Sequence, residues 1–345
     1  IPSHVVELAN TPSTIEKWRL PAGLVPDEVS VLIKRDDKTG FGLSGNKVRK
    51  LEFLMADAIK QGADSVITIG GVQSNHCRAT ACAAAKLGLE SYLILRQADD
   101  KLNDSVDPGL CGNLLINRLV GANLRMVSKS EYVKNGQFKL VSTLADQLTE
   151  QGKKPYKIAV GGSTTVGAWG YLQFVEELRQ QIAADKTEIS DIVVACGSGG
   201  STAGIAIGLK LAGLPIRLHG ILVCDNKQYF FKHIQDTIDA LGLPYKAEDL
   251  VVLHDEYRGK AYAVSTDEEL LVLQQVAATS AVLADPVYTG KAICGLVDLA
   301  RRGETFQGSH VLFVHTGGFF GLYDKKEQLS ALLPKDTATR LFPKL

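Results

Sequence analysis

Long apolar runs and an excess of one charge are both missing from this sequence. No run of apolar residues approaches the roughly 18 that cross a membrane as a helix. Lys+Arg and Asp+Glu each number 38, so the chain lacks the basic excess expected of a nucleic-acid binder. The sequence therefore predicts no membrane contact and no nucleic-acid partner, and a small molecule is the expected ligand.

Cysteine is present, but not in the patterns that bind metals or form disulfide frameworks. The six cysteines show no C-x-x-C spacing and no histidine cluster beside them, so no metal site is expected. Disulfide frameworks belong to short, cysteine-dense secreted chains, and this one has 345 residues. We expect buried free thiols in a soluble intracellular protein. The first residue is Ile1, so the compartment is the cytoplasm or, if a targeting peptide was removed upstream, an organelle such as the mitochondrion or chloroplast.

Internal repeats, low-complexity stretches and a Pro/Ser-rich linker are missing as well. Instead, short apolar runs alternate after Asn46 with longer stretches of helical spacing. The predicted strands are residues 65–69, 91–95, 157–160, 191–195, 217–223 and 310–314. This alternation predicts an α/β fold whose parallel sheets are covered on both faces. If the chain forms two domains, it crosses between them more than once.

Helices are predicted over residues 48–60, 76–87 and 112–120. In the first, Val48, Leu51 and Met55 recur at three- and four-residue spacing, which indicates one buried stripe. Its charged residues, including Arg49 and Lys50, fall mostly on the other face, and Gly62 ends the helix.

The first segment with possible chemistry is residues 44–47, which places Lys47 just before that helix. A helix dipole disfavours a cation at this end, and a solvated surface lysine is the ordinary explanation. The alternative is an amine whose pKa is lowered for imine chemistry.

The second segment, residues 70–76, follows a predicted strand and opens a helix. Its two glycines allow a ligand to approach the backbone, and the first amides of the helix can bind a carboxylate or phosphate. Ser74 and Asn75 either cap the helix or bind that ligand.

The third segment, residues 195–204, joins a predicted strand to a helix and has the composition of a phosphate cradle. The residues proposed for it are Gly197, Ser198, Gly199, Gly200, Ser201 and Thr202. No Gly-Lys-Ser/Thr follows, which excludes a Walker loop. A dinucleotide fingerprint fits two glycines, but Thr202 replaces the third and Asp225 lies beyond the usual offset of roughly 20 residues. A mononucleotide-sized phosphate fits better.

The fourth group consists of Tyr262, residues 285–291 and residues 315–318. The last of these follows a predicted strand, where open α/β sheets bind ligands. Taken singly, its tyrosines and threonines are ordinary packing and turn residues. Together, the four segments offer an amine, a carboxylate site, a phosphate cradle and hydroxyls. This combination favours pyridoxal 5'-phosphate as the cofactor and an amino acid as the substrate.

Five runs carry a resemblance to a known family: SGNKVRKLEFL, TIGGVQSNHCRATA, CGSGGSTAG, DPVYTGK and HTGG. In this order they resemble the family of D-cysteine desulfhydrases and 1-aminocyclopropane-1-carboxylate (ACC) deaminases, pyridoxal-phosphate enzymes of fold type II related to tryptophan synthase β. The resemblance implies a homodimer of two-domain chains. Two open, twisted, mostly parallel α/β domains hold the active site between them. Residues 1–47 and 160–345 form the large cofactor-binding domain, and residues 48–159 the smaller inserted one.

The resemblance also implies roles for single residues. Lys47 forms the imine with the cofactor and acts as the general base, while Lys50 and the 197–202 loop bind its phosphate. Asn75 bonds the cofactor ring oxygen, and Ser74 holds the substrate carboxylate. Further contacts with cofactor or substrate are expected from His76, Tyr262, Tyr288, Thr289 and Thr316.

Thr289 and Thr316 separate the two branches of the family, because ACC deaminases usually carry Glu and Leu there. A threonine hydroxyl can donate to an unprotonated ring nitrogen, which leaves a weaker electron sink suited to the loss of a thiolate. The predicted reaction is β-elimination of D-cysteine to pyruvate, ammonia and hydrogen sulfide. ACC deamination to 2-oxobutyrate and ammonia is the alternative. A nicotinamide-dependent oxidoreductase and a non-catalytic amino-acid-binding protein are more distant ones.

Overall fold

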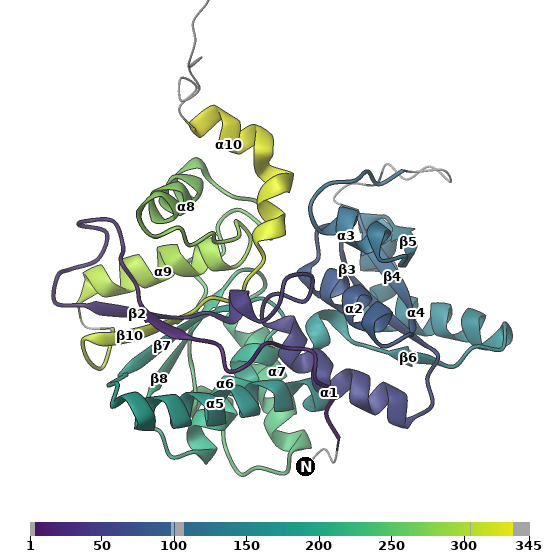
Figure 1. Ribbon diagram of the computed structural model, residues 1–345, viewed down its shortest axis with the longest axis horizontal. Helices are drawn as coiled ribbons and strands as arrows, with labels where there is room; N and C mark the ends of the chain where they lie inside the picture. The colour runs from purple at the N-terminus through teal and green to yellow at the C-terminus, as the bar shows by residue number, and fades with distance from the viewer. Residues whose placement is uncertain (1–3, 98–99, 101–106, 304, 334–345) are drawn as a thin grey trace, which may run out of the picture.

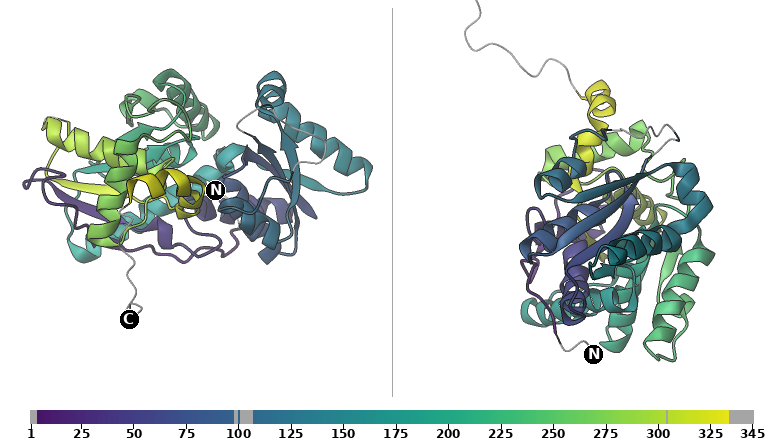
Figure 2. Two further views of the ribbon diagram at one scale, coloured as in Figure 1. Left: turned by 90° about the horizontal axis from the view of Figure 1, so that it is seen from above. Right: turned by 90° about the vertical axis from the view of Figure 1, so that its right-hand side faces the viewer.

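The structure is a computed structural model that describes residues 4–97, 100, 107–303 and 305–333. One mostly parallel sheet and one fully parallel sheet organise these residues into a large and a small unit, which lie side by side (Figures 1 and 2). The large sheet has the order β1 (Ile15–Lys17), β2 (Ser30–Lys34), β10 (His310–Val314), β7 (Asp191–Cys196), β8 (Arg217–Leu222) and β9 (Val252–His254). Within it, β1 and β2 are antiparallel and the other neighbours are parallel.

The small sheet has the order β5 (Asn123–Val127), β4 (Glu90–Arg96), β3 (Ser65–Gly71) and β6 (Pro155–Lys157), with every pair parallel. Helices of this unit are α1 (Lys47–Lys60), α2 (Asn75–Lys86), α3 (Asn113–Leu119) and α4 (Lys129–Glu150). Those of the large unit are α5 (Thr165–Asp185), α6 (Gly200–Leu211), α7 (Lys227–Ala240), α8 (Asp267–Ser280), α9 (Thr289–Arg302) and α10 (Lys326–Leu332). Short 3-10 turns lie at Asp36–Lys38, Val160–Gly162, Ala247–Asp249 and Phe319–Lys325.

Strand β7 shows why the strands of the large sheet are continuous apolar runs in the sequence. Ile192 and Val194 point to one face and pack in a core with α5, α6 and α7. Val193 and Ala195 point to the other face and pack with α8 and α9. Because helices cover both faces, every position of the strand is buried and no polar alternation appears.

The small sheet is covered in the same way. Val66 of β3 packs with α1 and α2, whereas its neighbours Ile67 and Ile69 pack with α4. Helix α1 also packs closely on α5 of the large unit and lies between the two units in Figure 1. The family resemblance implies two α/β domains, and the structure has two sheets. The exact domain boundaries at 47/48 and 159/160 stay a prediction.

The predicted α/β architecture is confirmed, and most predicted elements are present to within one or two residues at their ends. The strand predicted at 157–160 is wrong. Strand β6 is Pro155–Lys157, and the chain then turns through Gly161 and Gly162, both with positive φ. Ile158 is fully buried and its N–H still donates to the Ile67 carbonyl of β3 at 2.8 Å, so pairing with β3 ends at this residue and does not continue to Val160.

The predicted polar face of α1 is also wrong in part. Arg49, Lys50 and Glu52 are buried, because α5 and the N-terminal segment cover that side of the helix. All six cysteines are free thiols. Among the described residues, no helix combines the length and apolar character needed to cross a membrane, and no cluster of three or more potential metal ligands occurs.

Candidate active site

A cavity of about 450 Å³ lies where strands β3, β7, β8 and β10 end. Its wall includes the N-termini of α1, α2 and α6, so several sets of helix amides face one space. Among the residues predicted from the sequence, the cavity is lined by Lys47, Ser74, Asn75, His76, Gly197, Ser198, Gly199, Ser201, Thr202, Tyr262, Tyr288 and Thr316. The four sequence segments therefore meet in one place.

Lys47 is the first residue of α1 and lines the cavity. The loop before it is held against the end of β10. Asn46 N–H donates to the Thr316 carbonyl at 3.1 Å, and a Cβ on Gly45 would lie 2.6 Å from the same oxygen. Burial lowers the pKa of Lys47 to about 8. A larger share of the amine is therefore uncharged at neutral pH than for an ordinary lysine, as a nucleophile or base requires.

The N-terminus of α6 forms the predicted cradle. Gly199 precedes the helix with a φ of 82°, and the amides of Gly200, Ser201 and Thr202 have no carbonyl four residues earlier within the helix. The Thr202 hydroxyl is buried and has no hydrogen-bond partner among the described residues. A buried hydroxyl without a partner is costly, so this position suits a ligand oxygen.

Lys50 supplies a positive charge beside this helix end. Its side chain is only 1% exposed, and its Nζ donates to the Gly161 carbonyl at 3.1 Å. No carboxylate pairs with it within the described part of the chain. A Cβ on Gly200 would lie 2.9 Å from Nζ, which places the ammonium at the first turn of α6. Burial and the Lys47 charge lower the pKa of Lys50. A phosphate dianion would supply the missing countercharge.

Ser74 is both a cap and part of the cavity wall. Its Oγ accepts a hydrogen bond from Cys77 N–H at 3.2 Å, and it precedes the first residue of α2. The neighbouring Asn75 accepts from Asn113 Nδ2 at 2.9 Å, which orients its amide. His76 Nε2 lies 2.9 Å from the Thr68 hydroxyl, while its Nδ1 is buried without a partner. Burial and the two lysine charges lower the pKa of His76, so the imidazole is neutral.

Tyr262 and Tyr288 share a hydrogen bond between their hydroxyls, with ring centroids 5.9 Å apart. Burial raises the pKa of Tyr262 to about 12 and that of Tyr288 well above its ordinary value. A Cβ on Gly197 would lie 2.6 Å from the Tyr288 ring, so only glycine fits there. Both tyrosines remain protonated at neutral pH and can donate a proton or a hydrogen bond into the cavity.

Thr289 does not line the cavity, unlike Thr316. It is fully buried, and its hydroxyl accepts from Asp285 N–H at 2.7 Å and donates to Asp285 Oδ1 at 2.8 Å. The Asp285 carboxylate also accepts the amides of Val287, Tyr288 and Thr289, which closes the first turn of α9. In this structure the Thr289 hydroxyl is used by this turn, and its contact with a cofactor ring nitrogen stays a prediction.

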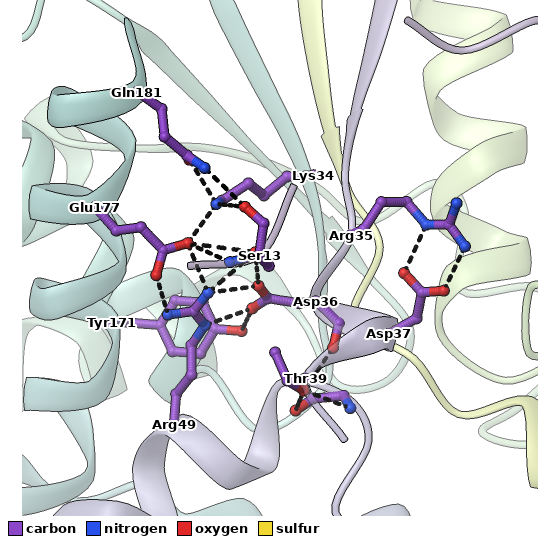
Figure 3. A network of polar contacts seen from close by, with 11 residues as sticks. Ser13, Lys34, Arg35, Asp36, Asp37, Thr39, Arg49, Tyr171, Glu177 and Gln181 are labelled. Atoms are coloured by element: carbon purple, nitrogen blue, oxygen red, sulfur yellow. Dashed lines mark hydrogen bonds and ion pairs between the residues drawn. The ribbon is translucent and has the colours of Figure 1, made fainter. Parts of the chain in front are cut away.

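A buried polar network behind the cavity was missed by the sequence analysis (Figure 3). Arg49 Nε and Nη2 donate to the two oxygens of Asp36 at 3.0 and 2.9 Å, and Arg49 also pairs with Glu177. Tyr171 donates to Asp36 Oδ2 at 2.8 Å. Glycine contacts bring the helices together here: a Cβ on Gly170 would lie 2.2 Å from the Arg49 carbonyl. The network thus joins α1, which carries Lys47, to α5.

The cavity also contains residues that the sequence analysis did not select. These are mainly Arg96, Tyr132 and Gln137 from the small unit and Cys224, Asp225 and Tyr229 from the large unit. The sequence identifies Asp225 only as a poorly spaced member of a dinucleotide fingerprint. The others carry no local motif, because their role depends on how the small unit faces the large one.

Comparison with known proteins identifies the class. Residues 7–317 match the family described as "Pyridoxal-phosphate dependent enzyme", and the chain belongs to this family. A bifunctional D-cysteine desulfhydrase/1-aminocyclopropane-1-carboxylate deaminase, mitochondrial, of Arabidopsis thaliana is 48% identical over 336 residues, which are 96% of this chain and 82% of the relative. A D-cysteine desulfhydrase of Serratia proteamaculans is 38% identical over 295 residues, which are 85% of this chain and 88% of that relative.

The solved structure of an ACC deaminase homologue superimposes with a TM-score of 0.81 at 35% identity, over 96% of both chains. The predicted fold type II architecture and pyridoxal phosphate as the cofactor are thereby confirmed. The residues present also fit that cofactor. At the N-terminus of α6, which borders the cavity, the Lys50 amine and the Thr202 hydroxyl lie beside the first helix amides, and neither has a carboxylate partner among the described residues. The nicotinamide alternative and the amino-acid-binding alternative are set aside by this family membership.

Proposed function

We propose that the protein is a lyase that converts D-cysteine into pyruvate, ammonia and hydrogen sulfide. The observation that carries this proposal is the pairing of a base and an acid in one cavity. Lys47 has a lowered pKa and so can accept a proton, whereas Tyr262 and Tyr288 have raised values and can donate one. β-Elimination needs both functions, because a proton leaves Cα and the departing sulfur takes one up.

The residues that would hold the cofactor follow from the same geometry. Lys50 and the first turn of α6 would bind the phosphate, with Thr202 as a hydroxyl donor. Asn75 would contact the ring, and Lys47 would bond the aldehyde. When bound, pyridoxal phosphate supplies an electron sink that stabilises negative charge at Cα of the amino acid.

The protein groups then divide the remaining work. Ser74 and the first amides of α2 would hold the substrate carboxylate at a helix N-terminus, where an anion is favoured. The Lys47 amine would take the Cα proton. The Tyr262–Tyr288 pair would protonate the sulfur as the Cβ–S bond breaks. His76 would be neutral, so it would not draw the substrate carboxylate away from Ser74 and the α2 amides.

ACC deamination is a second candidate activity. The sequence argument against it relied on Thr289 and Thr316, and Thr289 faces Asp285 instead of the cavity. The Arabidopsis thaliana relative is named for both reactions. Of these two threonines, only Thr316 lines the cavity, so it alone still supports the preference for D-cysteine.

The decisive experiment measures sulfide and pyruvate from D- and L-cysteine side by side, with ammonia and 2-oxobutyrate from ACC in parallel. We expect sulfide and pyruvate in equal amounts from the D isomer and far less from the L isomer. Equal rates from both isomers, or product from ACC alone, would overturn the proposed substrate.

We also propose a homodimer of 37.1 kDa chains in the cytoplasm or an organelle. Support comes from the family resemblance, and the Arabidopsis thaliana relative is named mitochondrial. Light scattering during size exclusion measures the assembly, and a monomer mass would exclude the dimer. Imaging of the full-length gene product with a tag at its C-terminus measures the compartment.

A further inference from the structure

One side of the cavity wall contains charged and polar groups that elimination from D-cysteine does not use. Arg96 lies at the end of β4, Tyr132 and Gln137 lie on α4, and Asp225 and Tyr229 follow β8. D-Cysteine has only a thiol on Cβ, and a thiol needs neither a guanidinium nor a carboxylate partner. These five residues are too polar to serve as an apolar cover for the site.

Arg96 is held in place by stacking, and its guanidinium donates no hydrogen bond to any residue that the structure describes. Its guanidinium lies over the Tyr132 ring, 5.2 Å from the centroid. No carboxylate forms an ion pair with it within the described ranges. A stacked guanidinium of this kind is already ordered, so it can bind a carboxylate with little loss of side-chain entropy.

Asp225 supplies the opposite charge. Its backbone has a φ of 50°, a left-handed conformation that aspartate tolerates better than most residues, and its carbonyl accepts from Arg258 Nη1. The thiol of the preceding residue, Cys224, donates to the Gly197 carbonyl at 3.1 Å, and the Asp225 carboxylate makes no ion pair among the described residues. The pKa of Tyr132 is raised, mainly by burial. The positive charge of Arg96 acts to lower this pKa, and the negative charge of Asp225 acts to raise it. Both charges therefore act on one tyrosine hydroxyl and lie in the same region.

Gln137 is placed by a break in its own helix. Gly136 has φ 70° and ψ 158°, so α4 is interrupted immediately before Gln137. The Gln137 Oε1 atom is buried and has no partner among the described residues. An amide oxygen in this state is expected to accept an N–H from a ligand, because leaving it unpaired is costly.

We propose that these residues form a subsite for the zwitterionic end of a sulfur-linked bis-amino acid. Arg96 binds the distal carboxylate, while Asp225 and Gln137 bind the distal ammonium. The reacting half is a D-cysteine residue whose sulfur carries the second amino acid as a thioether. This inference rests on the proposed function and names a wider substrate class for the same site.

The chemistry requires no additional reactant. The Cα–H and Cβ–S bonds of the reacting half break, and the electron pair from Cα–H forms the Cα=Cβ double bond. Sulfur leaves with the Cβ–S pair as a thiolate and takes up a proton, which releases the second amino acid as a thiol. The aminoacrylate then reacts with water to give pyruvate and ammonia, so nothing is oxidised or reduced overall.

Four thioethers of similar size test the subsite in the holoenzyme, with pyruvate as the readout. Lanthionine of D configuration carries both distal charges. S-carboxyethyl-D-cysteine carries only the carboxylate, S-aminoethyl-D-cysteine only the ammonium, and S-propyl-D-cysteine neither. We expect kcat/KM for lanthionine to exceed that for the propyl compound by about tenfold or more, with the singly charged compounds between them. Equal values for lanthionine and the propyl compound would overturn the proposal.

Two variants separate the two charges. Arg96→Gln should lower kcat/KM for the carboxyethyl compound by about tenfold more than for the aminoethyl compound, and Asp225→Asn should do the reverse. The matched control is Arg125→Gln, since Arg125 also stacks on a tyrosine, 5.8 Å from the Tyr92 centroid, but lies outside the cavity. It should leave all four rates unchanged. If Arg96→Gln and Asp225→Asn lower kcat/KM for all four thioethers equally, the two residues only shape the cavity wall, and the subsite is refuted.

D-Cysteine, assayed in the same preparation, keeps the two proposals apart. If D-cysteine releases no sulfide, the proposed function fails. If D-cysteine reacts and the four thioethers show no charge preference, only the subsite fails.

Discussion

Tyr171 donates its hydroxyl hydrogen to Asp36 Oδ2 at 2.8 Å, deep between α5 and the loop that leads to Lys47 (Figure 3). Asp36 also accepts from Arg49 of α1 at 2.9 Å, and Ser201 in the first turn of α6 accepts from Asn46 Nδ2 at 3.0 Å. Hydrogen bonds therefore hold the start of α1 both to α5 and to the phosphate cradle. We expect Tyr171, through Asp36, to act as a positioning residue for Lys47 and the cradle.

Removing the Tyr171 hydroxyl should disturb the site without leaving a cavity in the core. Tyr171→Phe keeps the packing of the ring on Gly204 and Phe174 but deprives Asp36 of a donor. We expect a loss of about 1–3 kcal/mol in unfolding free energy, the usual cost of a buried bond to a charged group. Weaker retention of pyridoxal phosphate should accompany it. Chemical denaturation and dialysis of the holoenzyme measure the two effects.

Tyr156→Phe is the matched control, because Tyr156 also donates to an aspartate, Asp57 Oδ2 at 2.7 Å, but lies away from the cavity. It should lower stability while leaving cofactor retention unchanged. If both variants lose the cofactor to the same degree, the effect follows from stability alone, and Tyr171 has no positioning role.

Lys50 makes anion binding by the cofactor-free protein dependent on pH. Its pKa is lowered, so raising the pH removes its positive charge earlier than for an ordinary lysine. Sulfate, which keeps its charge over this range, should raise the Tm more at about pH 6 than at about pH 9. Lys50→Met should remove most of this difference, whereas Lys60→Met, at the exposed end of the same helix, should not. A pH-independent sulfate effect in the parent would argue against Lys50 as the anion site.

Lys47→Ala separates bonding of the cofactor from binding of its phosphate. The variant should lose turnover and the visible absorbance of the bound cofactor, because Lys47 is the lysine of α1 that lines the cavity, whereas Lys50 donates to the Gly161 carbonyl. It should still bind sulfate, since Lys50 and the amides of α6 remain. Retention of more than trace activity after free cofactor is removed would exclude Lys47 as the bonding lysine.

Ser74 is expected to serve two roles, and a second serine cap can separate them. Ser74→Ala removes the cap of α2 and one contact for the substrate carboxylate, so stability should fall by roughly 1 kcal/mol and KM should rise. Ser128→Ala removes the cap of α4, where Ser128 Oγ accepts from Glu131 N–H at 3.1 Å. It should cost similar stability with unchanged KM. Equal KM values in both variants would leave Ser74 as a cap only.

Much of this fold could be predicted because its strands are buried on both faces. Strands such as β7 and β10 then appear as short apolar runs, and glycine-rich segments follow where the strands end. The site segments could be found for a related reason. Only glycine allows the contact at Gly197 with the Tyr288 ring or the left-handed turn at Gly199.

The contacts that the sequence did not reveal share a different cause. Arg49 and Thr289 are polar residues whose partners, Asp36 and Asp285, are identified only by the tertiary structure or the local turn. A charged residue on a helix is normally assigned to solvent, and Arg49 is buried because a carboxylate was brought to it from elsewhere. Gln137 escaped notice because a helix break turns it toward the cavity.

The last prediction uses Thr289 and Thr316, which the sequence treated alike and the structure separates. Valine has the shape of threonine without its hydroxyl, so Thr→Val at each position removes one hydroxyl with little change in volume. Thr289→Val leaves Asp285 N–H without its acceptor in a fully buried turn, which should cost about 1–3 kcal/mol of stability. Its ratio of D-cysteine to ACC turnover should stay unchanged.

Thr316→Val changes the cavity wall itself, where the side chain is 8% exposed. We expect little loss of stability and a lower ratio of D-cysteine to ACC turnover, because a polar contact for the thiol is replaced by an apolar surface that suits a cyclopropane ring. Sulfide from D-cysteine and 2-oxobutyrate from ACC, measured with thermal melts on both variants, decide the matter. A changed ratio in Thr289→Val with an unchanged one in Thr316→Val would mean that the α9 turn, and not the wall at the end of β10, sets the choice of substrate.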